Sequence, residues 1–457
     1  MHYGAIHSLH LVFPSMEHDL STLTEEWTRR VARYVGTYHL PGVAVAVAHG
    51  DEVVWARGFG YADVDARRPV RPDTVFRIAS ISKLFAALGI MVLAEEGRVT
   101  LDDPVIGHVP EFPDDAITIR DLLCHGSGLE RETPGDRGWR TGEFLFGDDF
   151  RAALSSAGVY FDRLEVFKYS NLGYNVLGEV VSNVTGGSYS EFVEKRVIAP
   201  LGLGSTTYDH TRLPPDRLAT GYRRRVDQSS VAPDERAWDA IWDAAGGLCS
   251  TVEDLCVLGA ALAGRRRAPV SEKTIEAMRR PLVIADPSWT KGHGLGPMLV
   301  RDADEVLVGH AGGLFSFAGW LLASPRSGVS AALLTNTSDG DPLLELAKGL
   351  IRDAAAHLPA TPQPSTEPVP EGLAPLLGRY WGDTELVTIV WRDGKLYMTP
   401  EPREGLPKNT DHGITRTGAG ELRVDDGPYA GEELHLERDT DGRVVAFEVC
   451  TYLFTRV

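Results

Sequence analysis

A proline-rich stretch in the last quarter of the chain limits what this sequence can fold into. Residues 358–372 read LPATPQPSTEPVPEG. Proline lacks a backbone N–H and fixes φ, so such a stretch extends neither a helix nor a sheet and presents no apolar face. The 457 residues, 43% of them hydrophobic, suffice for more than one core. We therefore expect one domain over residues 1–357, a linker over 358–372 and a second domain over 373–457.

The second domain has the pattern of short antiparallel strands. Asp-Gly pairs at 393–394 and 441–442 are typical of tight hairpin turns. Apolar and polar residues alternate over 386–391, 395–398, 433–436 and 444–454. This pattern predicts a small antiparallel β-barrel. A barrel can hold a ligand, but at this length we expect an interior filled by its own side chains.

The first domain carries a serine and a lysine three residues apart, where an extended segment turns into a helix. Ser80 and Lys83 open an apolar-periodic segment that ends near Gly97. Residues at this spacing share a helix face, so the hydroxyl and the amine can point into one space. A desolvated lysine with a lowered pKa can take the proton of a serine nucleophile. The alternative is a helix-capping serine with a solvated lysine.

The same spacing recurs at Ser288 and Lys291, and it serves as an internal comparison. Pro287 precedes this copy, and Gly292 and Gly294 follow it closely. These residues exclude a long helix there. We therefore expect Ser288 to be a decoy.

A second motif is Tyr169-Ser170-Asn171. A tyrosine whose pKa is lowered by a nearby ammonium can move a proton to and from the serine and the leaving group. The amide of Asn171 can bind a substrate amide or hold the lysine. The alternative is a loop tyrosine beside a helix-capping Ser-Asn pair.

A third motif, His310-Ala311-Gly312-Gly313, lies between two strand-like runs, 305–309 and 314–323. Glycines in a strand often mark the close approach of a ligand or of another backbone. The alternative is a histidine at a β-turn between two core strands. His125 and His293 lie outside the three motifs, and we expect them to be structural or to line a cleft.

The order and spacing of these motifs resemble the serine β-lactamase and penicillin-binding-protein superfamily, most closely its class C-like branch. That branch includes esterases, D-aminopeptidases and peptide-cyclising thioesterases. Similar segments lie at 41–62, 118–129 and 245–255, and the resemblance covers about 22–356. It implies an α+β fold, an antiparallel sheet with flanking helices plus an all-helical subdomain. Residues 377–381 resemble the first strand of the lipocalin-like domain that some relatives carry.

The resemblance also implies roles for the motif residues. Ser80 would be the acylated nucleophile, Lys83 its activator and Tyr169 the general acid/base. Asn171 would contact a substrate amide. The backbone N–H groups of Ser80 and Gly313 would form an oxyanion hole, which stabilises the charge on a tetrahedral carbonyl oxygen.

The third motif departs from the family pattern. We count His310 as a catalytic position and Gly312 and Gly313 as substrate-binding ones. Many relatives have lysine where this chain has His310. A lysine is a fixed cation suited to a substrate carboxylate, whereas histidine is mostly neutral at pH 7. This difference argues against an efficient β-lactamase or carboxypeptidase.

Three functions are compatible with these residues. The first is a serine hydrolase that forms an acyl-enzyme on Ser80 with small esters or short peptides, including D-amino-acid peptides. The second is a thioesterase or acyltransferase of the same fold that cyclises or couples peptides. The third is a non-catalytic receptor for a peptide or a β-lactam. We expect a small ester or peptide as the partner and no metal or organic cofactor, while the oligomeric state stays open.

Composition and the N-terminal residues limit the expected partners and localisation of the protein. A net charge of −18 and a pI near 5.2 disfavour binding to nucleic acid or to anionic membranes. Residues 1–14 lack a basic leader region and a long apolar run, so we expect no signal peptide, no membrane span and a cytoplasmic protein. The four cysteines form no Cys-x-x-Cys pair, and we expect Cys249 and Cys256 to be buried and reduced.

Overall fold

The computed structural model describes residues 16–141, 143–224, 231–238, 242–358, 370, 372–382, 386–392, 395–400, 412–417, 421–440 and 443–456. The chain divides into two compact units, Met1–Thr361 and Pro362–Val457. Most of the predicted linker and both predicted Asp-Gly turns lie outside the described residues.

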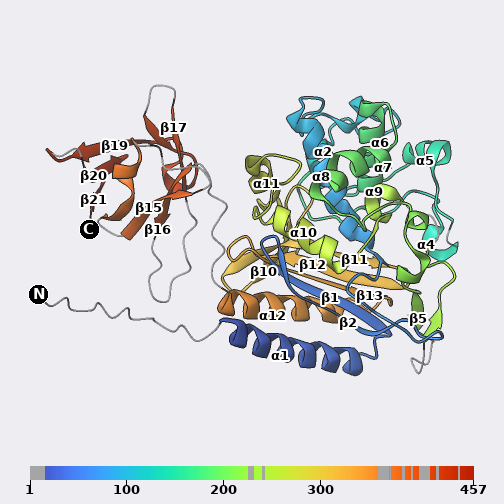
Figure 1. Ribbon diagram of the computed structural model, residues 1–457. Helices are drawn as coiled ribbons and strands as arrows, with labels where there is room; N and C mark the ends of the chain where they lie inside the picture. Colours follow the sequence, from blue (N-terminus) through green and yellow to red (C-terminus); the bar gives the residue numbers. More distant parts are fainter. Residues whose placement is uncertain are drawn as a thin grey trace, which may run out of the picture. The chain divides into compact units, whose positions relative to one another are not determined.

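The first unit is built on a nine-stranded antiparallel sheet in the order β3-β2-β1-β13-β12-β11-β10-β9-β8 (Figure 1). The segment 41–62, which resembles the family, forms the hairpin of β1 and β2. The last strand of this unit, β13, pairs with β1 in the register Val45↔Leu333. The strands are β1 (Gly42–His49), β2 (Glu52–Asp63), β3 (Arg68–Pro69), β8 (Val283–Ile284), β9 (Lys291–His293), β10 (Met298–Asp302), β11 (Glu305–Leu314), β12 (Phe317–Ala323) and β13 (Val329–Thr335).

Strand β1 explains why the sheet has a layer on each face. Its sequence is apolar at almost every position, the pattern of a strand buried on both sides. Because side chains alternate along a strand, its valines belong to one hydrophobic cluster and its alanines to another. The small alanines face the helical layer that carries Ser80, Lys83 and Asn171.

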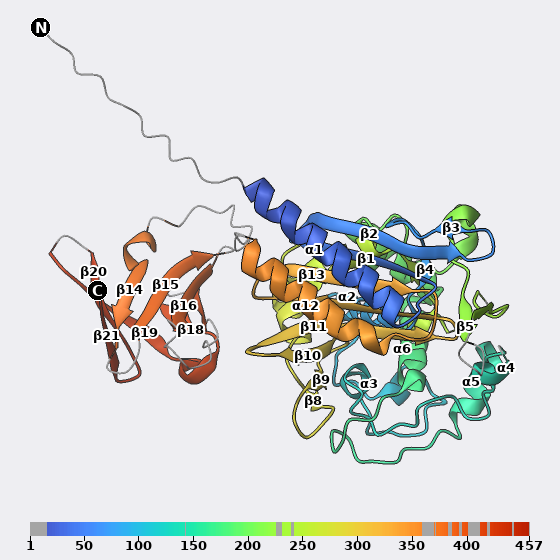
Figure 2. The same cartoon turned by 90° about the horizontal axis from the view of Figure 1, so that it is seen from below.

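Two terminal helices cover the valine face: α1 (Met16–Thr37) and α12 (Asp341–His357), which lie side by side (Figure 2). Arg30 of α1 forms a 2.7 Å ion pair with Asp353 of α12. Residues 22–25 read Thr-Leu-Thr-Glu, a capping-box pattern that predicts a helix beginning near Thr22, and this prediction is wrong. The helix begins at Met16, so Thr24 lies inside it and donates its hydroxyl to the carbonyl of Ser21.

A layer of helices covers the alanine face (Figure 1). At its centre is α2, in which every residue from Ser82 to Leu93 is buried. The helices are α2 (Ser82–Glu95), α3 (Ile119–Leu123), α4 (Gly138–Thr141), α5 (Gly147–Leu154), α6 (Asn171–Thr185), α7 (Tyr189–Val193), α8 (Ala199–Leu201), α9 (Asp243–Gly246), α10 (Val252–Leu262) and α11 (Glu272–Met278). Two small sheets join this layer, β4 (Phe76–Arg77) with β7 (Cys249–Ser250) and β5 (Tyr222–Arg224) with β6 (Val231–Pro233).

The second unit is a closed eight-stranded antiparallel barrel, as predicted. Its interior is filled by side chains, among them the stacked rings of Phe447 and Phe454 at 4.8 Å. Two of its strands, β17 and β18, were not predicted, and the predicted strand over 444–454 is two strands, with Cys450 between them at φ +57°. The strands are β14 (Gly378–Trp381), β15 (Leu386–Arg392), β16 (Lys395–Pro400), β17 (His412–Arg416), β18 (Leu422–Val424), β19 (Glu433–Arg438), β20 (Val444–Val449) and β21 (Tyr452–Arg456).

Two further expectations concern thiols and membranes. All four cysteines are free, and Cys249 and Cys256 are buried. Across the described part of the chain, the longest apolar helices fall short of what crossing a bilayer requires.

Candidate active site

Ser80 lies at a sharp turn between β4 and α2. It is the middle residue of a single 3-10 turn, η1 (Ala79–Ile81), so the α-helix begins two residues later than the sequence predicts. Ala79 has φ +49°, a left-handed conformation that is uncommon for a residue other than glycine. Ala79 and Ile81, the neighbours of Ser80, are buried. Ser80 itself is half-buried and lines a cleft.

Lys83, in the first turn of α2, is fully buried and makes three hydrogen bonds. Its Nζ donates to the Ser80 Oγ at 3.3 Å, to the Asn171 Oδ1 at 2.8 Å and to the Ala245 carbonyl at 2.7 Å. Burial lowers the pKa of Lys83 to about 7, partly offset by the charge of Glu132. A neutral amine is therefore populated near pH 7 next to the serine hydroxyl.

Tyr169 lines the same cleft as Ser80. Its side chain forms a hydrogen bond with Ser80, and its ring centre is 5.2 Å from the Lys83 Nζ. The expected direction of its pKa shift is wrong. Burial raises the pKa of Tyr169 to about 12, because desolvation outweighs the Ser80 hydrogen bond and the charge of Arg131. At neutral pH the phenol keeps its proton and is available as an acid.

Asn171 begins helix α6, and both ends of its amide are engaged. The oxygen accepts from Lys83, and the Nδ2 donates to the Glu132 Oε1 at 2.7 Å. Glu132 in turn forms a 3.3 Å ion pair with Arg131. Of the two tasks considered for this amide, holding the lysine is the one for which the structure gives a direct contact.

The third motif lies on strand β11, which packs against η1. A Cβ on Gly312 would lie 2.2 Å from the Ile78 carbonyl oxygen, so only glycine allows this approach. A Cβ on Gly313 would meet open space. His310 is buried, with its Nδ1 2.6 Å from the Ala311 carbonyl oxygen. Burial and the nearby Lys83 lower the pKa of His310 to about 3, so the ring is neutral.

The predicted residues meet at one cleft of about 320 Å³. Lys83 lies beneath it, in contact with Ser80, and the cleft is lined by Ser80, Tyr169, Asn171, His310, Gly312 and Gly313. The decoy Ser288 is exposed and belongs to the turn before β9. It takes no part in this cleft.

Sequence reasoning missed several residues of the site. Arg131 and Glu132 follow the 118–129 segment but match no motif, and only the fold brings them to Lys83 and Tyr169. Beside Ser80, a second pocket is lined by Glu132, Phe144, Asn175, Trp242 and Leu314. No periodicity or spacing in the sequence marks these positions as neighbours.

Comparison with known proteins identifies families for both parts of the chain. A family model described as Beta-lactamase matches residues 27–356, and one described as a domain of unknown function (DUF7586) matches residues 369–456. Protein flp of Staphylococcus aureus (strain MW2) is 27% identical over 305 residues, which cover 65% of this chain and 60% of flp. The chain thus spans less than two thirds of the length of this curated relative.

Solved structures give the same result. The octameric penicillin-binding protein homologue from Pyrococcus abyssi has a TM-score of 0.63 at 24% identity, with 94% of this chain and 99% of that chain covered. The D-amino acid amidase from Ochrobactrum anthropi SV3 has a TM-score of 0.59 at 26% identity, with 75% and 97% covered. The resemblance inferred from the three motifs is confirmed. Because the family model spans well over half of its residues, this protein belongs to the beta-lactamase family.

Proposed function

We propose that this protein is a serine hydrolase that forms an acyl-enzyme on Ser80 with small esters or short peptide amides. The observation that carries the proposal is the buried Lys83, whose pKa is about 7 and whose Nζ lies 3.3 Å from the Ser80 Oγ. A serine hydroxyl is a weak nucleophile until a neighbouring base takes its proton. A fully buried, hydrogen-bonded amine that is neutral near pH 7 is such a base.

The first half of the reaction follows from these contacts. The neutral Lys83 accepts the proton as the Ser80 Oγ attacks the substrate carbonyl. The tetrahedral oxyanion is stabilised by the backbone N–H groups of Ser80 and Gly313. Tyr169, which keeps its proton at neutral pH, donates it to the leaving alcohol or amine and is reprotonated by Lys83. The carbonyl–leaving-group bond breaks, and the acyl group remains on Ser80.

The second half reverses the roles. A water molecule loses a proton to the neutral Lys83 and attacks the acyl carbonyl, and Ser80 leaves with the proton that Lys83 returns. An amine in place of water would give acyl transfer, the second function compatible with the motifs. A receptor that never releases a product has no use for a complete base and acid beside one serine.

The pocket beside Ser80 supports an aminoacyl substrate. Phe144, Trp242 and Leu314 offer apolar surface, and Glu132 offers a carboxylate. The Oδ1 of Asn175 is buried and has no hydrogen-bond partner within the described residues. An acyl group with an α-ammonium and an apolar side chain matches this combination. The amidase relative, whose name specifies D-amino acid amides, supports the same class.

The test is labelling of the full chain with a fluorophosphonate, read by intact mass. We expect one adduct, lost in Ser80→Ala and kept in Ser288→Ala, the matched control. D- and L-phenylalanine amides and p-nitrophenyl butyrate then define the substrate, and added amines reveal acyl transfer. Adduct formation that survives Ser80→Ala would overturn the proposal, as would a labelled protein that turns over none of these substrates.

A further inference from the structure

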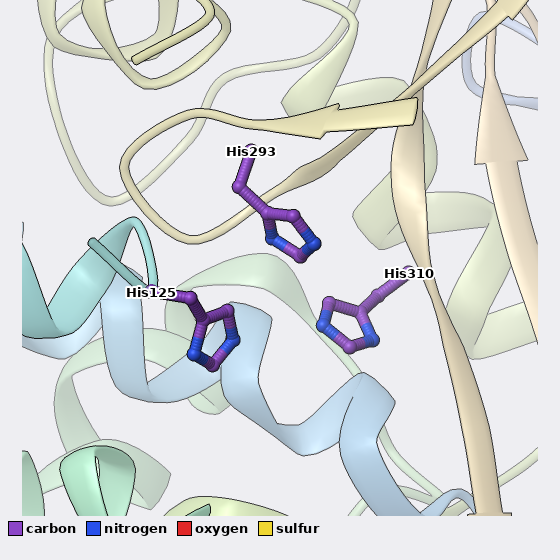
Figure 3. Close-up of side chains that lie close together, drawn as sticks. All are labelled: His125, His293 and His310. Carbon is purple, nitrogen blue, oxygen red and sulfur yellow. The ribbon is translucent and has the colours of Figure 1, made fainter. Parts of the chain in front are cut away.

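Three histidines from separate parts of the chain meet next to the cleft (Figure 3). His125 follows α3, His293 ends β9 and His310 lies in β11. All three are buried, and one ring nitrogen from each lies within 4.8 Å of the others. Figure 3 shows the three rings facing a common space.

Most of these ring nitrogens have no hydrogen-bond partner within the described ranges. The Nε2 atoms of His125 and His310, and both nitrogens of His293, have no hydrogen-bond partner among the described residues. A buried polar atom left without a partner costs about 1–3 kcal/mol. Four such atoms in one place indicate that the fold keeps them for something that binds between the rings.

The unpartnered nitrogens of these buried rings point to a ligand that binds lone pairs, because imidazole nitrogens are common metal ligands. Neutral imidazole is the form that ligates metals, and imidazole suits zinc, copper and nickel.

The surroundings prepare two of the rings as ligands. The Nδ1 of His310 donates to the Ala311 carbonyl at 2.6 Å, which leaves a lone pair on its Nε2. Such a bond to the second ring nitrogen is typical of metal-bound histidine. The ring of His293 is held by stacking on Phe167 at 4.8 Å, and neither of its nitrogens has a partner in the part of the chain that the structure describes.

His125 is prepared differently. The backbone N–H of Ser170 donates to its Nδ1 at 3.2 Å, so the neutral ring carries its proton on Nε2. That N–H is a donor aimed at the cluster rather than a ligand. It suits a further ligand of the ion, such as a water molecule.

We propose that His293 and His310 bind a divalent transition-metal ion of the zinc class, with His125 donating a hydrogen bond to a further ligand of that ion. Zinc–nitrogen bonds of about 2.0–2.1 Å hold two ligand atoms at most about 4.2 Å apart. A small rotation of the His293 and His310 rings would bring their nitrogens from within 4.8 Å of each other to this separation. His310 also lines the cleft, so the site borders the cleft on that side. This site does not depend on the hydrolase proposal.

The test is titration of the full chain with Zn²⁺ in competition with a chromophoric chelator, and with Co²⁺ read by its visible absorption. Fourteen histidines are present, so the result is the difference between matched variants. We expect one ion per chain to be lost in His293→Phe, which preserves the ring packed on Phe167. His357→Ala, at the exposed end of α12, should retain it.

His125→Phe should weaken binding about 10–100-fold, the range for a group that orients a metal ligand. Thermal unfolding checks that each variant folds, and Zn²⁺ should raise the midpoint of the wild type but not that of His293→Phe. If His293→Phe fails to fold, His293→Gln replaces it. A folded wild type that binds no ion, or stoichiometry unchanged by loss of the His293 ring nitrogens, would overturn the site.

Discussion

The amine of Lys83 sets the pH at which the site can react. Its pKa is about 7 instead of 10.5, so the base is protonated below pH 7 and neutral above it. We expect kcat/KM for an ester to rise about tenfold per pH unit below pH 7 and to level off above it. The rate of fluorophosphonate labelling should depend on pH in the same way. A rate independent of pH between 5 and 8 would remove Lys83 from the role of base.

Glu132 offers a finer check on the same residue. Its charge raises the pKa of Lys83, so Glu132→Gln should shift the acid limb to lower pH. Lys83→Met should abolish turnover, yet thermal unfolding should show no loss of stability at pH 7. The unfolded state binds the lysine proton more tightly, so burying this amine costs stability there, and the cost declines as the pH rises from 7 toward 10.5.

Tyr169→Phe removes the proton donor without removing the ring. We expect kcat for an amide to fall about 10²–10⁴-fold, with KM little changed. A p-nitrophenyl ester should lose much less, because its leaving group departs without a proton. Steady-state kinetics on both substrates distinguish the two cases. Equal losses on both would assign Tyr169 to positioning Ser80 instead of to proton donation.

At the scale of elements, the approach of β11 to the turn η1 holds the site together. Gly312→Ala would drive a Cβ into the Ile78 carbonyl, so the turn that carries Ser80 must move. We expect a destabilisation of about 1–3 kcal/mol and a loss of about 10²-fold in kcat, the cost of a misplacement near 1 Å. Gly313→Ala is the matched control for stability, with open space for its methyl group. Equal unfolding temperatures for both variants would contradict this account.

Local patterns predicted most of these elements. Apolar runs over 305–323, 328–335 and 343–356 predict β11 to β13 and α12. The hairpin of β1 and β2 was expected from the family resemblance of residues 41–62. The start of α1 was missed because the capping-box pattern at 22–25 lies inside the helix, which begins at Met16. The strand β18 was missed because it has three residues, and so short a strand carries a weak signal.

The site was predictable to the extent that it is made of motifs. Ser80 and Lys83, with Tyr169, could be identified from spacing, and the fold brings them into contact. The direction of the Tyr169 pKa shift could not be predicted, because it depends on burial by segments far away in the sequence. The same limit hid the three histidines, for which the sequence led us to expect no metal site. Their rings share a space only after β9, β11 and the end of α3 have assembled.

On the scale of the whole molecule, the two units have separate hydrophobic cores. The barrel core draws only on residues 373–454. We therefore expect two transitions in calorimetry. Phe447→Ala should lower the temperature of the barrel transition alone, because it reduces the free energy of unfolding of the barrel by about 3–5 kcal/mol. Ester hydrolysis at 25 °C should stay unchanged. Phe317→Ala, in the core of the first unit, is the complementary variant. A single transition that both substitutions move would show that the cores unfold together.

The position of β13 between β1 and β12 has a consequence for how the protein is made. The hairpin of β1 and β2 leaves the ribosome early, but its neighbour in the sheet is β13, which ends at Thr335. Until then the nascent chain exposes an unpaired apolar edge, which is prone to association with other chains. The serine at the centre of the site is thus translated long before a polypeptide exists that can use it. Messages truncated before that codon should yield aggregation-prone fragments and no active enzyme.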